Sequence, residues 1–233
     1  MSENVLSQQQ IARMIDISAV QAPHGEGEIR DLIARASVYG FGSVHVLPAW
    51  VTFARELLPR GEILLGAPVG FPSGGHHSKT KRAEAQQLVA DGVDELDMML
   101  NVGKLRSGAE AYVLEDIRGV VGAVNVPVKV ILETHYLTDE EIRRACELCI
   151  TAGAQFVKTS TGWAASGATL HNITLITGCV AGRIGVKASG GIRDLDTLVA
   201  MYRLGVRRFG INADASVAIL RAVEKLPGGV VRM

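Results

Sequence analysis

Runs of apolar residues alternate with amphipathic runs along the whole chain, and this alternation limits the fold more than any other feature. Eight short runs are rich in β-branched and aliphatic residues, as is typical of buried parallel strands. Segments with helical spacing lie between them, and several end at a glycine, as in "EIRDLIARASVYG" and "RDLDTLVAMYRLG". The expected strands span residues 14–18, 43–47, 62–68, 94–100, 128–133, 155–160, 184–189 and 207–212.

Eight strands, each followed by a helix, predict an α/β protein with the (β/α)8 architecture of a TIM barrel. The chain has 233 residues, of which 48% are hydrophobic, so we expect a single domain with one large core over residues 1–233. A doubly wound open sheet is the alternative, but it usually has fewer strands and often a glycine-rich first turn, which is absent here. Before the first strand, "LSQQQIARM" predicts a short N-terminal helix that caps the bottom of the barrel.

The charge and cysteine content argue against several classes of partner and location. The formal net charge is zero, so nothing suggests binding to nucleic acid or to an anionic membrane surface. The polar N-terminus does not resemble a signal peptide, and no apolar run approaches the ~18 residues of a membrane span. Three cysteines make a disulfide framework improbable, and Cys146 and Cys149 fit two thiols packed on a helix better than a metal or redox site. We expect a cytoplasmic protein with small-molecule partners.

Two of the expected strands carry a lysine where the strand should end. Lys158 lies in "QFVKTS" and Lys187 in "IGVKAS". Burying an ammonium group is costly unless it is paired or neutralised. In TIM barrels the C-terminal strand ends and the loops that follow them carry the chemistry, and these two strands are neighbours. The two lysines are therefore expected to lie close together at the functional end of the barrel.

Alternation along two other strands adds carboxylates to this region. Residues 95, 97 and 99 share one face of their strand, and residues 129, 131 and 133 share one face of the next. If both faces point inward, Asp97 lies near the lysines, and Glu95 can pair with Lys129 one layer deeper. Glu133 would then point inward as well, as a second candidate for proton transfer.

Paired lysines beside a carboxylate suit one kind of chemistry. A lysine amine attacks a carbonyl only when neutral, and with an ordinary pKa of about 10.4 well under 1% is neutral at pH 7. Burial and a neighbouring cation both lower that pKa. One lysine would form a Schiff base, the other would keep it nucleophilic, and Asp97 would move protons through a water. This is the set of groups of a class I aldolase, although a buried charge network that only shapes the barrel interior is the alternative.

Five motifs give the chain a resemblance to the deoxyribose-phosphate aldolase family. They are "GFPSG" (70–74), "DGVDELDMMLNVG" (91–103), "VKVILET" (128–134), "FVKTSTG" (156–162) and "VKASGGIR" (186–193). The resemblance implies that Lys158 forms the imine, that Lys187 is the second lysine and that Asp97 relays protons. It also implies reversible cleavage of 2-deoxy-D-ribose 5-phosphate into D-glyceraldehyde 3-phosphate and acetaldehyde, on a TIM barrel without a metal or organic cofactor.

The chain departs from the family pattern on its first two strands and at its end. The first strand reads "DISAVQAP", which keeps Asp16 and a hydroxyl at Ser18. The second strand carries His45 where a cysteine is common, and a lone strand histidine is more often a satisfied core residue than a catalyst. The chain ends "PGGVVRM", without the tyrosine with which some members end.

The expected phosphate end follows the last strands, because TIM barrels often hold phosphate there and at a helix N-terminus. Asp214 has two readings in this region: it caps the last helix, or it repels phosphate and alters the preference for substrate. The candidate residues for substrate and phosphate binding are Asp16, Ser18, Gly162, Gly190, Gly191, Arg193, Gly210 and Asn212.

Three further expectations concern metal, assembly and competing functions. The adjacent histidines in "GGHHSKTK" (74–81) indicate a loop leading into a helix and not a metal site. A homodimer or higher homo-oligomer is expected by analogy with other barrels. The competing functions are a related class I aldolase that prefers non-phosphorylated or other small aldehydes, and a non-catalytic barrel that binds sugar phosphates.

Overall fold

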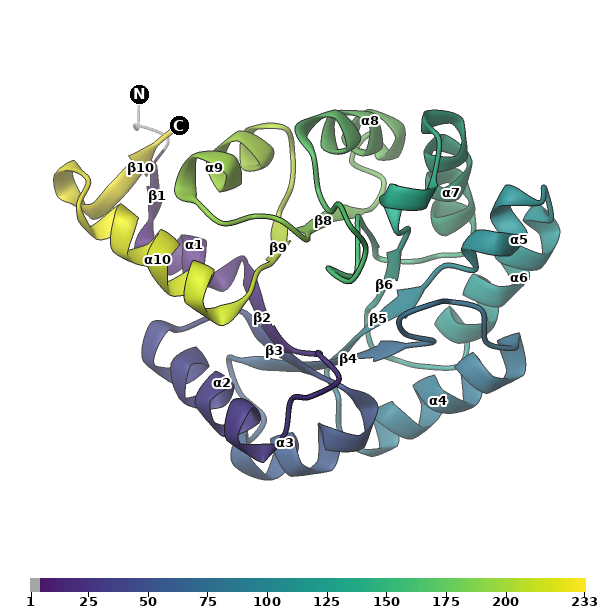
Figure 1. The fold of residues 1–233 in the computed structure, drawn as a ribbon, viewed down its shortest axis with the longest axis horizontal. Coiled ribbons are helices and arrows are strands. Elements are labelled where there is room, and N and C mark those ends of the chain that lie inside the picture. Colours follow the sequence, from purple (N-terminus) through teal and green to yellow (C-terminus); the bar gives the residue numbers. More distant parts are fainter. Residues whose placement is uncertain (1–4) are drawn as a thin grey trace.

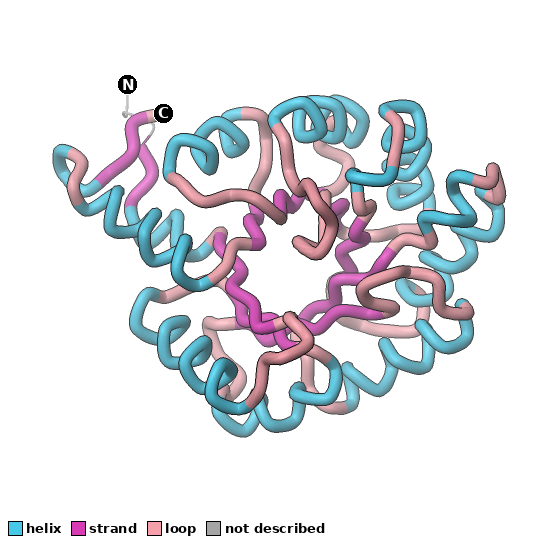
Figure 2. Tube along the Cα trace, viewed as in Figure 1, coloured by secondary structure: helices cyan, strands magenta, loops and turns pink. Residues whose placement is uncertain are grey.

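The computed structural model describes residues 5–233, which contain a closed barrel of eight parallel strands (Figures 1 and 2). Their order around the barrel follows their order in the chain, and pairing of β2 with β9 closes the ring. The predicted TIM barrel is therefore confirmed. The strands are β2 (Ile15–Ala19), β3 (Ser43–Val46), β4 (Leu64–Val69), β5 (Glu95–Met99), β6 (Val128–Ile131), β7 (Phe156–Lys158), β8 (Gly185–Ser189) and β9 (Arg208–Gly210).

Helices surround the ring of strands on its outside, as Figure 2 shows. Thr138 caps the helix after β6 through a capping box with Glu141, and Gly40 ends the helix after β2 in a left-handed conformation. Short 3₁₀ turns cover Pro48–Trp50, Thr134–Tyr136 and Pro227–Gly229. The helices of the ring are α2 (Glu26–Tyr39), α3 (Val51–Leu57), α4 (Ser78–Ala90), α5 (Val102–Arg106), α6 (Glu110–Val121), α7 (Asp139–Thr151), α8 (Leu170–Val180), α9 (Leu195–Arg203) and α10 (Ala213–Glu224).

The two ends of the described chain form a small element that the sequence did not predict. The expected N-terminal helix is present as α1 (Gln8–Arg13), and its Ile11 is fully buried beside the start of β2. Before it, β1 (Val5–Ser7) pairs antiparallel with β10 (Val230–Arg232), so these two strands lie side by side near α10 (Figure 1). β1 and β10 have three residues each, which is too short for an alternation of apolar and polar residues to be recognised in the sequence. Within residues 5–233, no helix has the length and apolar character needed to cross a membrane.

Several strands are shorter than predicted. The clearest case is the fifth run, which was expected to continue to residue 133 but ends at Ile131 in the structure. Glu133 has a φ of 52°, a left-handed conformation that a strand cannot contain. The expectation that Glu133 continues the inward-facing side of this strand is therefore wrong.

A buried ion pair ties helix α4 to the barrel. Lys81 of α4 is fully buried, and its Nζ lies 2.6 Å from Asp116 of α6 and 3.0 Å from the carbonyl of Met99 at the end of β5. Nearby, the backbone N–H of Gly70 donates to Glu84 of α4 at 2.7 Å. Gly70 has a φ of 67°, and a Cβ there would lie 2.9 Å from Cε of Lys81. Helix α4 thus holds both the end of β5 and the loop that follows β4.

Breaking this pair should destabilise the whole barrel. Lys81→Met leaves the Asp116 carboxylate buried without its partner, which typically costs about 3–5 kcal/mol of unfolding free energy. Adding Asp116→Leu removes that carboxylate and should recover most of the loss. Urea denaturation of the wild type, the single variant and the double variant measures these differences. A double variant no more stable than Lys81→Met would contradict this account.

Candidate active site

A cavity of about 250 Å³ opens at the C-terminal ends of the barrel strands. All eleven residues that the sequence nominated for catalysis or substrate binding line it, and they come from β2, β5, β7, β8, β9 and the loops that follow. Sequence reasoning missed other wall residues, which are mostly apolar or had been assigned to the core. The full lining is Asp16, Ser18, Val20, Gln21, His45, Pro68, Phe71, Asp97, Lys158, Thr161, Gly162, Lys187, Ser189, Gly190, Gly191, Ile192, Arg193, Gly210, Ile211 and Asn212.

The two lysines meet at one oxygen of Asp97. Strands β7 and β8 pair with Lys158 opposite Lys187, and both side chains point into the barrel. The Nζ atoms of Lys158 and Lys187 each lie 2.7 Å from Oδ2 of Asp97. Lys187 also contacts Oδ2 of Asp16 at 2.6 Å. The proximity of the three residues, predicted from strand order and alternation, is therefore confirmed.

A second layer of charge lies beneath these residues. Lys129 contacts Glu95 at 2.8 Å, which confirms the predicted pair, and it also approaches Oδ1 of Asp97 at 3.2 Å. Arg208 reaches Asp16 at 2.5 Å and Glu95 at 2.8 Å, a role that the sequence analysis did not assign. Among the described residues, this network joins three carboxylates, of Asp16, Glu95 and Asp97, to four basic side chains, of Lys129, Lys158, Lys187 and Arg208.

The surroundings of the two lysines shift their pKa values in opposite directions. Burial lowers the pKa of Lys158, and the charge of Lys187 lowers it further, although Asp97 acts in the opposite direction. Burial also opposes the ammonium form of Lys187, but the carboxylates of Asp16, Asp97 and Glu95 outweigh it and raise that pKa. The side chain of Lys158 is 11% exposed and that of Lys187 is 1% exposed. The lysine that loses its proton more readily is therefore also the one that a ligand can reach.

The carboxylate of Asp97 stays ionised within this cluster. Burial alone would favour its neutral form, but the surrounding cations of Lys158, Lys187 and Lys129 outweigh burial and hold its pKa well below the usual range. An ionised carboxylate can accept a proton and return it, provided that a water or substrate group lies within reach.

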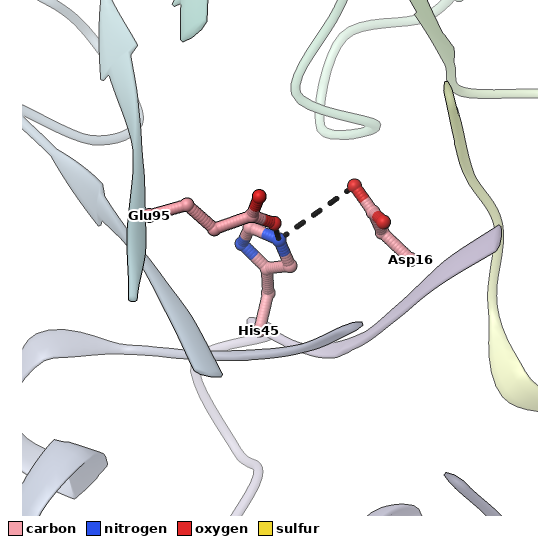
Figure 3. A group of neighbouring side chains, drawn as sticks. All are labelled: Asp16, His45 and Glu95. Atoms are coloured by element: carbon pink, nitrogen blue, oxygen red, sulfur yellow. Dashed lines mark hydrogen bonds and ion pairs between the residues drawn. The ribbon is translucent and has the colours of Figure 1, made fainter. Parts of the chain in front are cut away.

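Asp16, His45 and Glu95 form a cluster of neighbouring side chains (Figure 3), of which Asp16 and His45 line the cavity. Nε2 of His45 lies 3.1 Å from Glu95 and 3.7 Å from Asp16. His45 is buried and hydrogen-bonded, as expected for a core histidine, but it also forms part of the cavity wall. Three residues of this kind can ligate a metal, yet each carboxylate oxygen here already contacts a basic nitrogen of Lys129, Lys187 or Arg208. The geometry favours an ion-pair network over a metal site.

The far end of the cavity is built from glycine-rich backbone. Gly190 and Gly191 follow β8 with φ values of 87° and 83°, which favour glycine. The loop between β7 and α8 lies directly against them, and a Cβ on Gly167 would be 2.3 Å from the carbonyl oxygen of Gly190. Ala168 donates its N–H to the carbonyls of Ser189 and Gly190. Figure 2 shows this loop extending over the opening of the barrel.

Asp214 does not occupy either position expected for it. Helix α10 begins after Asn212, whose side chain accepts a hydrogen bond from the N–H of Ala215 at 2.9 Å, so Asn212 is the cap. The Asp214 carboxylate is 88% exposed and lies 2.5 Å from Arg35, and Asp214 is not among the residues that line the cavity. The prediction that Asp214 caps the helix was wrong, because the helix begins two residues earlier. The repulsion of phosphate suggested for it also lacks a structural basis.

Two other expectations concern polar residues near the site. Glu133 is buried and accepts hydrogen bonds from the N–H and hydroxyl of Thr161, so it braces the segment after β7 and does not line the cavity. His77 accepts a hydrogen bond from the N–H of Lys79 and caps α4, which confirms the expected loop leading into a helix.

The C-x-x-C pair packs on a helix, as predicted. Cys146 and Cys149 are buried on helix α7 as free thiols. Burial raises the pKa of Cys146 to about 12 and that of Cys149 well above its usual value. Thiols with such pKa values are poor nucleophiles and poor metal ligands at neutral pH.

A (β/α)8 barrel whose cavity joins two lysines to one carboxylate has the make-up of an aldolase barrel. The model of the DeoC/LacD family of aldolases matches residues 15–222, and the chain belongs to that family. It is therefore an enzyme, a lyase of the aldolase type.

The chain is similar over most of its length to deoxyribose-phosphate aldolases from several organisms. It is 51% identical to that of Klebsiella pneumoniae subsp. pneumoniae, over 93% of this chain and 88% of the relative, and 51% identical to that of Rhizobium meliloti, over 96% and 91%. The relative from Methanothermobacter thermautotrophicus is 43% identical over 92% and 96%.

Solved structures agree with the sequence comparisons. The tetrameric deoxyribose phosphate aldolase from Aeropyrum pernix matches with a TM-score of 0.85 and 28% identity, over 95% of this chain and 94% of that one. An aldolase named QR15 matches with a TM-score of 0.86 and 36% identity, over 92% and 96%.

The ionised carboxylates of the site should make the fold sensitive to acid. The pKa of Asp97 is lowered in the folded protein, so the stability that it contributes is present above its unfolded pKa and is lost as the pH falls towards the folded value. Below about pH 4, Asp97→Asn should show a slope of unfolding free energy against pH that is flatter by about one proton, or ~1.4 kcal/mol per pH unit. Urea titrations between pH 3 and pH 7 measure both slopes. Parallel slopes for wild type and variant would contradict the ionised state of Asp97.

Proposed function

We propose that the protein is a deoxyribose-phosphate aldolase that works through a Schiff base on Lys158. The reaction is the reversible cleavage of 2-deoxy-D-ribose 5-phosphate into D-glyceraldehyde 3-phosphate and acetaldehyde. Membership of the aldolase family and 43–51% identity to enzymes of that name support the substrate. The observation that carries the mechanism is that Lys158, at the wall of the cavity, contacts the same oxygen of Asp97 as Lys187 does.

The chemistry begins at the neutral amine of Lys158. Its Nζ attacks the aldehyde carbon of the open-chain sugar, and loss of water gives a protonated imine. Removal of the proton from the C3 hydroxyl then breaks the C2–C3 bond, whose electrons flow into the imine to form an enamine. D-glyceraldehyde 3-phosphate leaves, the enamine carbon takes up a proton, and water releases acetaldehyde and the free lysine.

Asp97 and Lys187 support different parts of this sequence. Lys187 remains an ammonium because Asp16 and Asp97 hold its charge, and that charge favours the neutral form of Lys158. Asp97 accepts and returns protons through a water, because its carboxylate stays ionised in the resting site. In this reading Asp16, which also pairs with Arg208, anchors Lys187, and its carboxylate is less free for substrate than the sequence suggested.

The phosphate is assigned to the glycine-rich end of the cavity. Gly190 and Gly191 let backbone approach the ligand closely, and Arg193 supplies a charge at the rim. Gly162, Gly210 and Asn212 complete that wall, and Ser18 offers its hydroxyl to the sugar. The alternative preference for non-phosphorylated aldehydes is not favoured, since Asp214 pairs with Arg35 outside the cavity.

We infer a single domain over residues 1–233, supported by one barrel to which nearly every element contributes. A homodimer or higher homo-oligomer is proposed by analogy with the tetrameric relative from Aeropyrum pernix. The free, buried thiols of Cys146 and Cys149 support the cytoplasm as its location, because reduced cysteines are typical of that compartment.

Trapping with borohydride tests the Schiff base directly. Borohydride should reduce the imine formed with acetaldehyde, and peptide mapping should find the two-carbon adduct on Lys158. Lys129 and Lys187 serve as internal controls, since both are almost fully buried and should stay unmodified. Lys158→Met should form no adduct and should lose turnover while remaining folded. An adduct at a different lysine in the wild type would sink the assignment.

The phosphate end can be tested by comparing two substrates. Arg193→Met should lower kcat/KM for deoxyribose 5-phosphate about tenfold, equivalent to ~1.4 kcal/mol, and leave that for deoxyribose nearly unchanged. Asp214→Ser is the matched control, because Asp214 lies outside the cavity and should leave the ratio of the two values unchanged. A ratio that responds to Asp214→Ser and not to Arg193→Met would contradict this placement of the phosphate.

A further inference from the structure

His45 lies in the cavity wall and has not yet been assigned a role. The neighbouring strand, β4, leaves room for its imidazole ring. His45 pairs in register with Gly66 of β4, and its imidazole lies across that glycine. A Cβ on residue 66 would lie 2.3 Å from Cε1 of the ring and 2.6 Å from Nδ1. Because residue 66 has no side chain, the ring can extend over β4 towards Asp97 of β5, with one edge at the cavity.

The neighbours of His45 fix which ring nitrogen carries the proton. Nε2 faces two carboxylate oxygens, at 3.1 Å from Glu95 and 3.7 Å from Asp16, and ionised carboxylates only accept hydrogen bonds. The hydrogen must therefore sit on Nε2. Burial and the charge of Lys187 lower the pKa of His45, so the ring is neutral and Nδ1 keeps a free lone pair.

That lone pair faces the oxygen at the centre of the site. Nδ1 lies 3.9 Å from Oδ2 of Asp97, the atom that both Lys158 and Lys187 contact. Two acceptors at this separation do not bond to each other. A single water or hydroxyl group, however, can donate to both of them, since each hydrogen bond needs only about 2.8 Å.

We propose that His45 is a positioning residue for the aldol reaction, whose Nδ1 and Asp97 together hold the water that carries protons to and from the carbon next to the imine. The inference rests on the proposed Schiff base at Lys158. When the imine of acetaldehyde becomes an enamine, a methyl proton passes to this water, which gives one of its own protons to Asp97. The reverse step returns a proton to the carbon, so His45 undergoes no net change and only keeps the water in line.

Two substitutions separate this role from a structural one. In His45→Asn, the amide oxygen can take the place of Nδ1 as an acceptor, but the side chain is too short to reach Glu95. In His45→Gln, the amide nitrogen can replace Nε2 as the donor to Glu95, but no acceptor remains at the position of Nδ1. The first variant keeps the proposed function of the ring, and the second keeps its structural bond.

The experiment measures two steps of the reaction with acetaldehyde alone. Borohydride trapping at Lys158 reports imine formation, and loss of the methyl proton signal in D₂O reports enamine formation. Urea denaturation reports the stability of each variant. His45→Gln should slow exchange about tenfold or more relative to trapping, whereas His45→Asn should keep the ratio within about threefold of the wild type. His45→Asn should nevertheless be the less stable of the two, because it leaves Glu95 without its imidazole donor.

The opposite order of stability and exchange in the two variants is the result that supports the proposal. Exchange that follows stability, with His45→Gln the better enzyme, would assign His45 a purely structural role and overturn the inference. Equal exchange-to-trapping ratios in both variants and the wild type would overturn it as well. Failure of the wild type itself to trap acetaldehyde at Lys158 would instead refute the proposed function, and this inference with it.

Discussion

The arrangement of the reactive groups in this barrel depends on one oxygen atom, Oδ2 of Asp97. Both lysines approach it to 2.7 Å, and Lys187 is locked further by Asp16 at 2.6 Å. Because Lys187 has two carboxylate partners and Lys158 has one, the same environment raises the pKa of Lys187 and lowers that of Lys158. Two chemically identical side chains on neighbouring strands thereby become a fixed cation and a nucleophile. The difference arises from position alone, since the strands hold both lysines in direct register.

The balance of charged groups in the barrel interior also favours a neutral Lys158. Among residues 5–233, the network around Asp97 contains three carboxylates and four basic groups, so one base exceeds the number of acids. An unpaired charge in a buried site is costly, and that cost falls when one base gives up its proton. Lys158 is the member of the set that lies at the cavity, with 11% of its side chain exposed. Deprotonation of Lys158 therefore balances the charges of the interior and at the same time produces the reactive amine.

The sequence predicted the barrel and the contents of its cavity because both depend on short periods. Eight buried apolar runs identify eight strands. In a closed barrel of parallel strands, the C-terminal ends of all the strands lie at the same end of the barrel. This is why Lys158, Lys187, Asp97 and the glycines after β8 all line one cavity. The pair of Glu95 with Lys129 followed from alternation along β5 and β6.

What the sequence did not predict depends on contacts between distant segments. Arg208 lies at the start of β9, where nothing in the local pattern signals that its guanidinium reaches Asp16 and Glu95 across the barrel. The cap of α10 was misplaced because Asn212 and Asp214 are both good capping residues, and only the backbone shows that the helix begins after Asn212. His45 was read as a core residue, since its access to the cavity depends on Gly66 on the neighbouring strand.

The site divides the two lysines into one nucleophile and one cation, and direct titration of both ammonium groups tests this division most closely. Lysine side chains labelled with ¹³C next to Nζ report each ammonium group by NMR as the pH rises, and Lys158→Met and Lys187→Met assign the two signals. Lys158 should lose its proton below the ordinary pKa of about 10.4, and Lys187 should stay protonated beyond it. Titration of Lys187 first, or of both residues together near the ordinary value, would contradict it.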